Sequence, residues 1–191
     1  MAKILVFNSV TLDGYFTDAK GDMSWAHKDP NDAEWNAFVG ENASGGASGG
    51  GAILLGRITY EMMASFWPTP EAAKMMPDVA NGMNSMQKIV FSRSMKKASW
   101  SNTKLVNGDL VAEVRKLKES DQDMVILGSG TIVSQLTQAR LIDEYQLVVN
   151  PVILGKGRTM FEGVKDKLGL KQTNTRNFKN GNVVLTYEPQ R

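Results

Sequence analysis

Residues 52–61 read Ala-Ile-Leu-Leu-Gly-Arg-Ile-Thr-Tyr-Glu, and the rest of the chain is organised around this stretch. Its four apolar residues predict a strand that is buried on both faces, and the amphipathic residues 60–66 predict a helix after the break at Gly56. A helix start offers unpaired N–H groups and a partial positive charge. The junction formed by Gly56, Arg57 and Thr59 is therefore a candidate anion site. The alternative is an ordinary strand–helix turn with Thr59 near the cap.

Two more apolar runs end in similar polar junctions. Residues 88–91 lead into Ser92-Arg93-Ser94, and residues 124–127 lead into Gly128-Ser129-Gly130-Thr131. Helical spacing of apolar residues follows at 110–117 and again at 132–139. This alternation predicts an α/β fold with a mostly parallel sheet. Later strands are expected at 144–149, 168–175 and 183–187, the last two as antiparallel strands that form a terminal hairpin or a pair of strands around Asn180-Gly181.

The remaining segments give weaker signals. A first strand is expected at residues 3–7, followed by an Asp13-Gly14 turn. Asp29 is a candidate N-cap, with Pro30 at the first position of a helix that ends near Asn42. Residues 44–51 have the Gly/Ser composition of a mobile connector. Residues 68–84 are expected to be irregular or partly helical, and Asp109 to cap the helix over 110–117.

Composition excludes several classes of protein. The 191 residues fit a single domain, 1–191. Without cysteine and with one histidine, His27, neither a disulfide nor a metal site is expected. A net charge of +2 without a long basic run argues against nucleic acid as a partner. No run approaches the roughly 20 apolar residues of a membrane span, and the start does not have the pattern of a signal peptide, so a cytoplasmic protein is expected.

The three polar junctions are expected at one edge of the sheet. Ligands of open α/β sheets bind beyond the carboxyl ends of parallel strands, where all three junctions lie. Arg57 and Arg93, with neighbouring hydroxyls, suit a ligand that carries several phosphates. Gly128 and Gly130 let the backbone approach such a ligand closely. Val133 stands where the dinucleotide fingerprint has its last glycine, so a plain strand–helix turn stays open as the alternative.

The motifs also resemble a known superfamily. Three of them, in order, are similar to the cofactor motifs of dihydrofolate-reductase-like proteins: Leu55-Gly56-Arg57-x-Thr59-Tyr60-Glu61, Val90-Phe91-Ser92-Arg93-Ser94 and Leu127-Gly128-Ser129-Gly130-Thr131. Two others resemble the reductase domain of the bifunctional riboflavin-biosynthesis enzyme and its stand-alone relatives: Asn8 to Tyr15 with its Leu-Asp-Gly, and Pro151-Val152-Ile153-Leu154-Gly155-x-Gly157-x-x-x-Phe161. The similarity covers nearly the whole chain.

The resemblance implies a three-layer α/β/α domain with a mixed, mostly parallel sheet that binds NADPH. By motif match, one group of residues would hold the pyrophosphate and adenosine side: Gly56, Arg57 and Thr59. A second would meet the adenine ribose and its 2′-phosphate: Ser92 and Arg93. A third would line the pyrophosphate and nicotinamide side: Gly128, Ser129, Gly130 and Thr131.

Candidates for the chemistry are less well marked. Reduction of a C=N or C=O bond needs a source of protons, and Asp13 and Asp32 are the candidate catalytic residues. Each has a structural alternative, Asp13 as a turn former and Asp32 as an acid in the first turn of a helix. His27 is interpreted as a surface loop residue. Substrate contacts are expected from four residues: Asn8, Trp25, Lys156 and Arg158. Lys156 and Arg158 would bind a phosphate of the substrate, or they belong to a solvated loop.

These patterns together predict an NADPH-dependent reductase of a small pyrimidine- or pteridine-like substrate. Aminouracil-ribosyl-phosphate reductase activity is the variant within this class. The alternative is a nucleotide- or ligand-binding dimer of the same fold without turnover. The resemblance also implies a homodimer, for which the apolar residues 146–154 are candidates for pairing across the interface.

Overall fold

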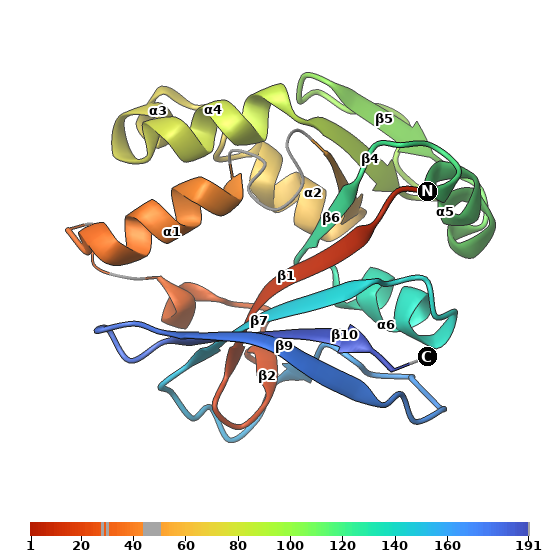
Figure 1. The fold of residues 1–191 in the computed structure, drawn as a ribbon. Coiled ribbons are helices and arrows are strands. Elements are labelled where there is room, and N and C mark those ends of the chain that lie inside the picture. The colour runs from red at the N-terminus through yellow and green to blue at the C-terminus, as the bar shows by residue number, and fades with distance from the viewer. Residues whose placement is uncertain (28, 30, 44–50, 191) are drawn as a thin grey trace.

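The chain folds around one eight-stranded sheet, and Figure 1 shows helices on both sides of it. The computed structural model describes residues 1–27, 29, 31–43 and 51–190. The strands are β1 (Ile4–Thr11), β2 (Tyr15–Thr17), β3 (Ala52–Gly56), β4 (Gln87–Phe91), β5 (Thr103–Val106), β6 (Met124–Leu127), β7 (Glu144–Asn150), β8 (Arg158–Thr159), β9 (Leu170–Asn177) and β10 (Val183–Pro189). The helices are the 3-10 turn η1 (Ser24–Ala26), α1 (Ala33–Ala43), α2 (Arg57–Ala64), α3 (Pro70–Met75), α4 (Pro77–Ser85), α5 (Leu110–Lys118) and α6 (Gly130–Gln138).

Six neighbouring strands of the sheet are parallel. The strand order is β5-β4-β3-β6-β1-β7-β10-β9, and the pairs are parallel from β5 to β7. The hairpin β9–β10 then adds two antiparallel pairings at one end. The predicted mixed, mostly parallel sheet is therefore confirmed. The carboxyl ends of β4, β3 and β6 lie next to one another, as the sequence predicted.

One face of the sheet packs on α5 and α6. The alternate residues Ala52 and Leu54 of β3 join a core with Ile4, Val6 and Ile126 from the neighbouring strands. The helices complete this core with side chains at helical spacing: Leu110 and Val114 of α5, and Ile132, Val133 and Leu136 of α6. Burial on both faces explains why β3 reads as an unbroken apolar run.

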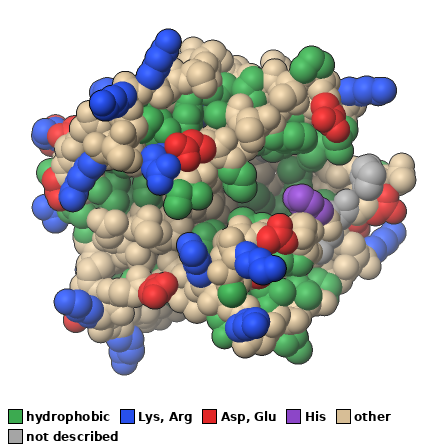
Figure 2. Space-filling view, turned by 180° about the vertical axis from the view of Figure 1, so that it is seen from behind, with side chains coloured by type: hydrophobic (Ala, Val, Ile, Leu, Met, Phe, Trp, Pro, Cys, Tyr) green, Lys and Arg blue, Asp and Glu red, His purple; other side chains and the backbone are tan. Residues whose placement is uncertain are grey.

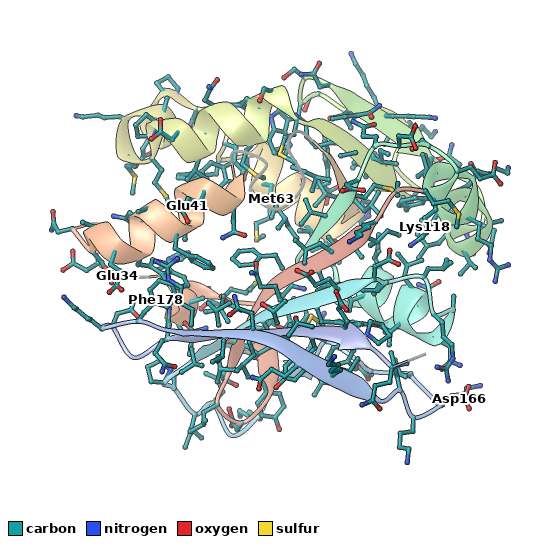
Figure 3. All side chains as sticks on the ribbon, viewed as in Figure 1. Glu34, Glu41, Met63, Lys118, Asp166 and Phe178 are labelled. Atoms are coloured by element: carbon teal, nitrogen blue, oxygen red, sulfur yellow. The ribbon has the colours of Figure 1, made fainter. Side chains whose placement is uncertain are left out.

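The opposite face carries two separate apolar clusters. Ile53 and Leu55 pack with Tyr60 of α2 and with Val79 and Met83 of α4. Over the other half of the sheet, α1 covers β7 and β10 with this set: Trp35, Phe38, Phe178, Val148 and Val184. The Trp35 and Phe178 rings stand edge to face with centroids 5.0 Å apart, and Phe178 is labelled below α1 in Figure 3. Two helix groups on one face leave room between them.

Several sequence predictions need correction at this level. The N-cap prediction for Asp29 is wrong, because α1 begins at Ala33 and the Asp32 carboxylate accepts the Trp35 N–H at 3.0 Å. Pro30 and residues 44–50 of the predicted connector lie outside the described residues. The stretch after Trp67 is more regular than expected, since it forms α3 and α4. Thr69 caps α3, and a proline opens each helix. No helix in the described part of the chain is long and apolar enough to cross a membrane.

Edge-to-edge pairing of β7 with a second copy does not fit this sheet. β7 is an inner strand, hydrogen-bonded to β1 on one side and to β10 on the other, so neither of its edges is free. Residues 151–154 follow it without strand structure. The apolar character of β7 reflects its position inside the sheet.

A buried lysine fixes α4 to the sheet. Lys88 of β4 is fully buried, and its ammonium donates to the carbonyls of Met83 and Asn84, each at 3.0 Å. These carbonyls belong to the last turn of α4, which favours a cation. The ammonium also lies 4.4 Å from the Trp100 ring centroid. Burial nevertheless lowers the pKa of Lys88 to about 8.

This pKa predicts a pH dependence of stability. The pKa is about 8 in the folded chain against an ordinary 10.5, so above pH 8 the unfolded chain binds the proton more strongly. The free energy of unfolding should therefore rise with pH relative to a Lys88→Met variant. The free energy of unfolding of the wild type, relative to that of Lys88→Met, should rise by about 1–3 kcal/mol between pH 8 and pH 10.5. Below pH 8 the difference between the two proteins should not change with pH. Urea unfolding at a series of pH values measures it. Lys104→Met, which removes an exposed ammonium from β5, is the control, and parallel curves for wild type and Lys88→Met would contradict the prediction.

Candidate functional site

Two helix starts lie side by side at the carboxyl edge of the sheet. α2 follows β3 and α6 follows β6, and these two strands are neighbours. The Gly56 N–H donates to the Ser129 hydroxyl at 2.8 Å, and the Ser129 N–H donates to the Thr59 hydroxyl at 3.1 Å. Neither cap residue, Gly56 or Ser129, accepts a hydrogen bond from its own helix through a side chain. Both helices thus begin at one shared edge without a side-chain cap.

Gly128 is the point where three segments meet. Gly128 and Ser129 both have left-handed backbone conformations, with φ of 65° and 55°. The Asn8 side chain of β1 accepts from the Gly128 N–H at 2.5 Å and donates to its carbonyl at 3.3 Å. A Cβ on Gly128 would lie 2.9 Å from the Thr59 methyl group. The position therefore needs glycine for its conformation and for the space that Thr59 occupies.

The third junction lies beside the first. Phe91, the last residue of β4, pairs with Gly56, so Ser92 and Arg93 follow next to the start of α2. The Ser92 hydroxyl accepts the N–H groups of Ser94 and Met95 at 3.3 and 3.0 Å and closes a turn. Arg93 is exposed at this edge.

Arg57 has a partner of its own. Its guanidinium donates to both carboxylate oxygens of Glu61, one turn along α2, at 3.2 and 3.1 Å. Both side chains are about half exposed. An exposed ion pair of this kind contributes about 1 kcal/mol or less, so it is readily exchanged for another anion.

A cavity of about 340 Å³ opens between the two helix groups on the α1 side of the sheet. Its floor is formed by β1 and β6. Met63 lies on α2, facing the space toward α1 (Figure 3). Figure 2 shows His27, the purple side chain, beside a hollow bordered by apolar side chains. The described lining residues are Leu5, Phe7, Asn8, Ser9, Met23, Ala26, His27, Val39, Asn42, Gly51, Met62, Met63, Trp67, Val79, Met83, Met86, Met124, Val125, Leu127 and Gly128.

The cavity and the edge of helix starts share residues. Gly128 and Asn8 line the cavity, and both belong to the hydrogen-bonded cluster that joins the starts of α2 and α6. A ligand that extends along the edge would therefore reach the cavity where the backbone at Gly128 has no side chain in the way.

The two candidate acids have structural partners instead. The Asp13 carboxylate accepts from the Thr11 hydroxyl at 2.6 Å and from the Gly155 and Leu154 N–H groups at 2.7 and 3.2 Å. The Thr11 hydrogen bond, with those from the backbone, holds the pKa of Asp13 below its usual value. Asp32 caps α1 and accepts from the Asn180 amide at 2.8 Å. Neither carboxylate is among the described lining residues, and the contacts of both are those that their structural alternatives predict.

The predicted substrate residues are only partly brought together. Asn8 lines the cavity, but its amide is occupied by Gly128 and by the Met160 sulfur at 2.9 Å. Trp25 is half-buried, and its indole N–H has no partner in the described part of the chain. Its neighbours Met23, Ala26 and His27, rather than Trp25, line the cavity. Lys156 and Arg158 are exposed near the small β2–β8 sheet, away from the described lining.

The sequence missed most of the cavity wall. His27 was interpreted as a surface residue, and it is exposed, yet it stands at the cavity. Four of the missed residues come from α2, from α4 and from the turn between α2 and α3: Met62, Met63, Met83 and Trp67. The amphipathic pattern of residues 60–66 was the signal that could have pointed to Met62 and Met63. That pattern cannot separate side chains that fill a core from side chains that border a cavity.

Comparison with known proteins gives one family and several relatives. Residues 2–184 match the family model described as the RibD C-terminal domain. The uncharacterized protein YyaP of Bacillus subtilis (strain 168) is 28% identical over 186 residues, which cover 97% of this chain and 94% of that protein.

Solved structures share the fold at lower identity. A protein of Shewanella sp. PV-4 named for riboflavin biosynthesis has a TM-score of 0.76 at 24% identity, with both chains fully covered. The deaminase/5-amino-6-(5-phosphoribosylamino)uracil reductase of Thermotoga maritima has a TM-score of 0.65 at 17% identity, covering 99% of this chain and 57% of that one. Dihydrofolate reductase from Enterococcus faecalis, complexed with NADP(H), has a TM-score of 0.63 at 15% identity, covering 99% and 97%. The predicted dihydrofolate-reductase-like fold is confirmed.

The contact at Gly128 yields a stability prediction. Gly128→Ala should lower the free energy of unfolding by about 1–3 kcal/mol, because alanine is strained at positive φ and its methyl group meets Thr59. Adding Thr59→Ser removes the methyl group but keeps the hydroxyl, so the double variant should recover part of the loss. Gly40→Ala in α1, where a Cβ meets nothing within 4 Å, is the control and should be neutral or stabilising. Chemical denaturation measures all four proteins, and a Gly128→Ala variant as stable as wild type would refute the argument.

Proposed function

We propose, from the premise that this chain belongs to the RibD C-terminal domain family, that it is an NADPH-dependent reductase of a small organic substrate. The observation that carries the proposal is the pair of helix starts at Gly56 and Ser129, hydrogen-bonded to each other and without side-chain caps. Helix N-termini bind phosphate through free N–H groups and the helix dipole. Two of them side by side fit a pyrophosphate.

The junction residues are assigned as follows in this proposal. The starts of α2 and α6, held together by Gly56 and Ser129, bind the pyrophosphate through the backbone at Arg57, Thr59, Gly130 and Thr131. Arg57 leaves its exposed ion pair with Glu61 to meet a phosphate oxygen. Ser92 and Arg93 take the adenine ribose with its 2′-phosphate, since an arginine there favours NADPH over NADH.

The reactive end of the cofactor belongs at Gly128. A bound NADPH would supply a hydride there, at the mouth of the cavity. Gly128, fixed by Asn8, leaves its backbone open to a flat ring, and the apolar floor of β1 and β6 excludes water from the reacting atoms. The chain orients the two reactants, while the proton comes from water or from His27, the only titratable side chain in the described lining. Asp13 and Asp32 are not assigned to this step, since both serve turns and caps.

The composition of the described lining also favours a second candidate. A nucleotide-binding protein of the same fold without turnover would need no acid near the cavity, and none of the described lining residues is Asp or Glu. Incubation with NADPH and panels of aminopyrimidines, dihydropteridines and quinones separates the two. Tight NADPH binding without oxidation by any of them would favour the binding protein.

A homodimer is part of the proposal. Leu12 and Ile153 are 65% and 69% exposed on segments joined by the Leu12 N–H to Val152 carbonyl hydrogen bond of 2.9 Å. Two apolar side chains on adjoining loops suit a contact between copies.

Light scattering after size-exclusion chromatography tests this contact. The wild type should have twice the mass of the chain, and the double variant Leu12→Ser/Ile153→Ser should have the mass of one chain. Met75→Ser removes an equally exposed apolar side chain from α3 and should leave the mass unchanged. A monomeric wild type would end the dimer proposal and leave the reductase proposal intact.

The choice of cofactor is tested at Arg93. Arg93→Ala should weaken NADPH binding about 10- to 100-fold, the loss expected for hydrogen bonds between a guanidinium and a phosphate. NADH binding should change less than about 3-fold, because it lacks the 2′-phosphate. Isothermal titration calorimetry measures both affinities. Lys97→Ala removes another exposed cation from the same loop and serves as the control. Equal losses for NADPH and NADH would refute the role of Arg93, and no binding of either cofactor to the wild type would refute the proposed function.

A further inference from the structure

The cavity wall is built from unusually adaptable apolar side chains. Six of the described lining residues are methionines: Met23, Met62, Met63, Met83, Met86 and Met124. Phe7, Trp67 and Val79 add to this surface. Methionine is flexible and polarizable, and its sulfur makes favourable contacts with aromatic rings. Such a wall accommodates flat apolar ligands of variable shape.

The described part of the wall provides no counter-charge. No Asp, Glu, Lys or Arg is present among the described lining residues, whose polar side chains are Asn8, Ser9, His27 and Asn42. Of these, Asn8 already uses both ends of its amide. Among the described lining residues, a phosphate or another fixed charge that lost its hydration in the cavity would find no charged partner, which costs several kcal/mol.

Two ligand classes fit this wall poorly. A pyrimidine with a ribose phosphate needs cations for the phosphate, and the candidates Lys156 and Arg158 lie away from the described lining. A pterin or aminopyrimidine ring presents adjacent N–H donors that pair best with a carboxylate. Asp32, the candidate for that role, is held by the start of α1 and by Asn180.

We propose that the cavity takes an uncharged, apolar, conjugated carbonyl compound of one or two rings, of which a quinone is the representative. The inference rests on the proposed function, because the hydride must come from the reduced nicotinamide. Reduction of a quinone breaks one C–H bond of the dihydronicotinamide. The hydride forms one O–H bond, and a proton from water or His27 forms the second. The products are a hydroquinone and NADP⁺.

Binding without the cofactor tests the inference directly. The probes are 2-methyl-1,4-naphthoquinone, which is neutral, and 1,4-naphthoquinone-2-sulfonate, which carries one negative charge on the same ring system. Trp67 lies in the wall, so a bound quinone should quench its fluorescence. The neutral quinone should bind at least 10-fold more tightly than the sulfonate. Trp67→Phe should remove most of the quenching while the neutral quinone still raises the melting temperature.

A charge introduced into the wall should reverse this preference. Met62 lines the cavity but is 50% exposed, so Met62→Lys leaves the core intact. This variant should bind the neutral quinone more weakly and the sulfonate more tightly than the wild type does, moving the ratio of the two affinities by at least 10-fold toward the sulfonate. Met75→Lys, at a 58% exposed position on α3 outside the described lining, is the matched control and should leave the ratio unchanged.

The outcomes separate the inference from the proposed function. A wild type that binds the sulfonate as tightly as the neutral quinone, while NADPH still binds, would overturn the inference alone. A wild type that oxidises NADPH with the neutral quinone, at a rate that exceeds the sulfonate rate, would support both. Absence of NADPH binding would overturn the proposed function and, with it, the reductive step assigned to the cavity.

Discussion

The pair of hydrogen bonds that link Gly56, Ser129 and Thr59 is the constraint on which the rest of the site depends. Each bond satisfies a backbone N–H with a side-chain oxygen from the other loop, so the starts of α2 and α6 cannot shift independently. The left-handed turn at Gly128 and Ser129 makes this possible, because it directs the Ser129 hydroxyl at Gly56 rather than at its own helix. The first turns of both helices therefore carry no side-chain cap from Gly56 or Ser129.

The parallel sheet places this pair where a ligand can also reach a cavity. β6 lies between β3 and β1, so the turn after β6 contacts Thr59 on one side and Asn8 on the other. In the described part of the chain, the α1 side of β1 and β6 borders a cavity between two helix groups, each of which has its own apolar cluster. The cavity at that position is a consequence of how the helices divide the sheet between them.

The carboxylates illustrate how tertiary contacts assign roles. Asp13 and Asp32 both had a sequence context suited to proton transfer and one suited to a turn or cap. In the folded chain, Asp13 binds N–H groups of residues 154 and 155, far away in the sequence, and Asp32 binds Asn180 of the terminal hairpin. These long-range partners give both carboxylates a structural role that their local sequence does not specify. Each side chain thus holds two distant segments of the chain together.

The sequence by itself determined the order and type of the main elements, because the spacing of apolar residues and the positions of glycines are local properties. It also determined that the sheet is mostly parallel and that the polar junctions share one edge of it. The edge was predictable since the carboxyl ends of parallel strands must coincide, whatever the details of packing. The start of α1 was misplaced by several residues, because Asp29 and Asp32 carry equivalent capping signals. In the folded chain Asp32 is the cap, and its bond to Asn180 and the packing of Trp35 against Phe178 are both long-range contacts. The Met-rich wall, the position of His27 and the partners of Asp13 were decided by tertiary structure alone. They depend on distances between segments far apart in the chain, and no local pattern encodes those distances.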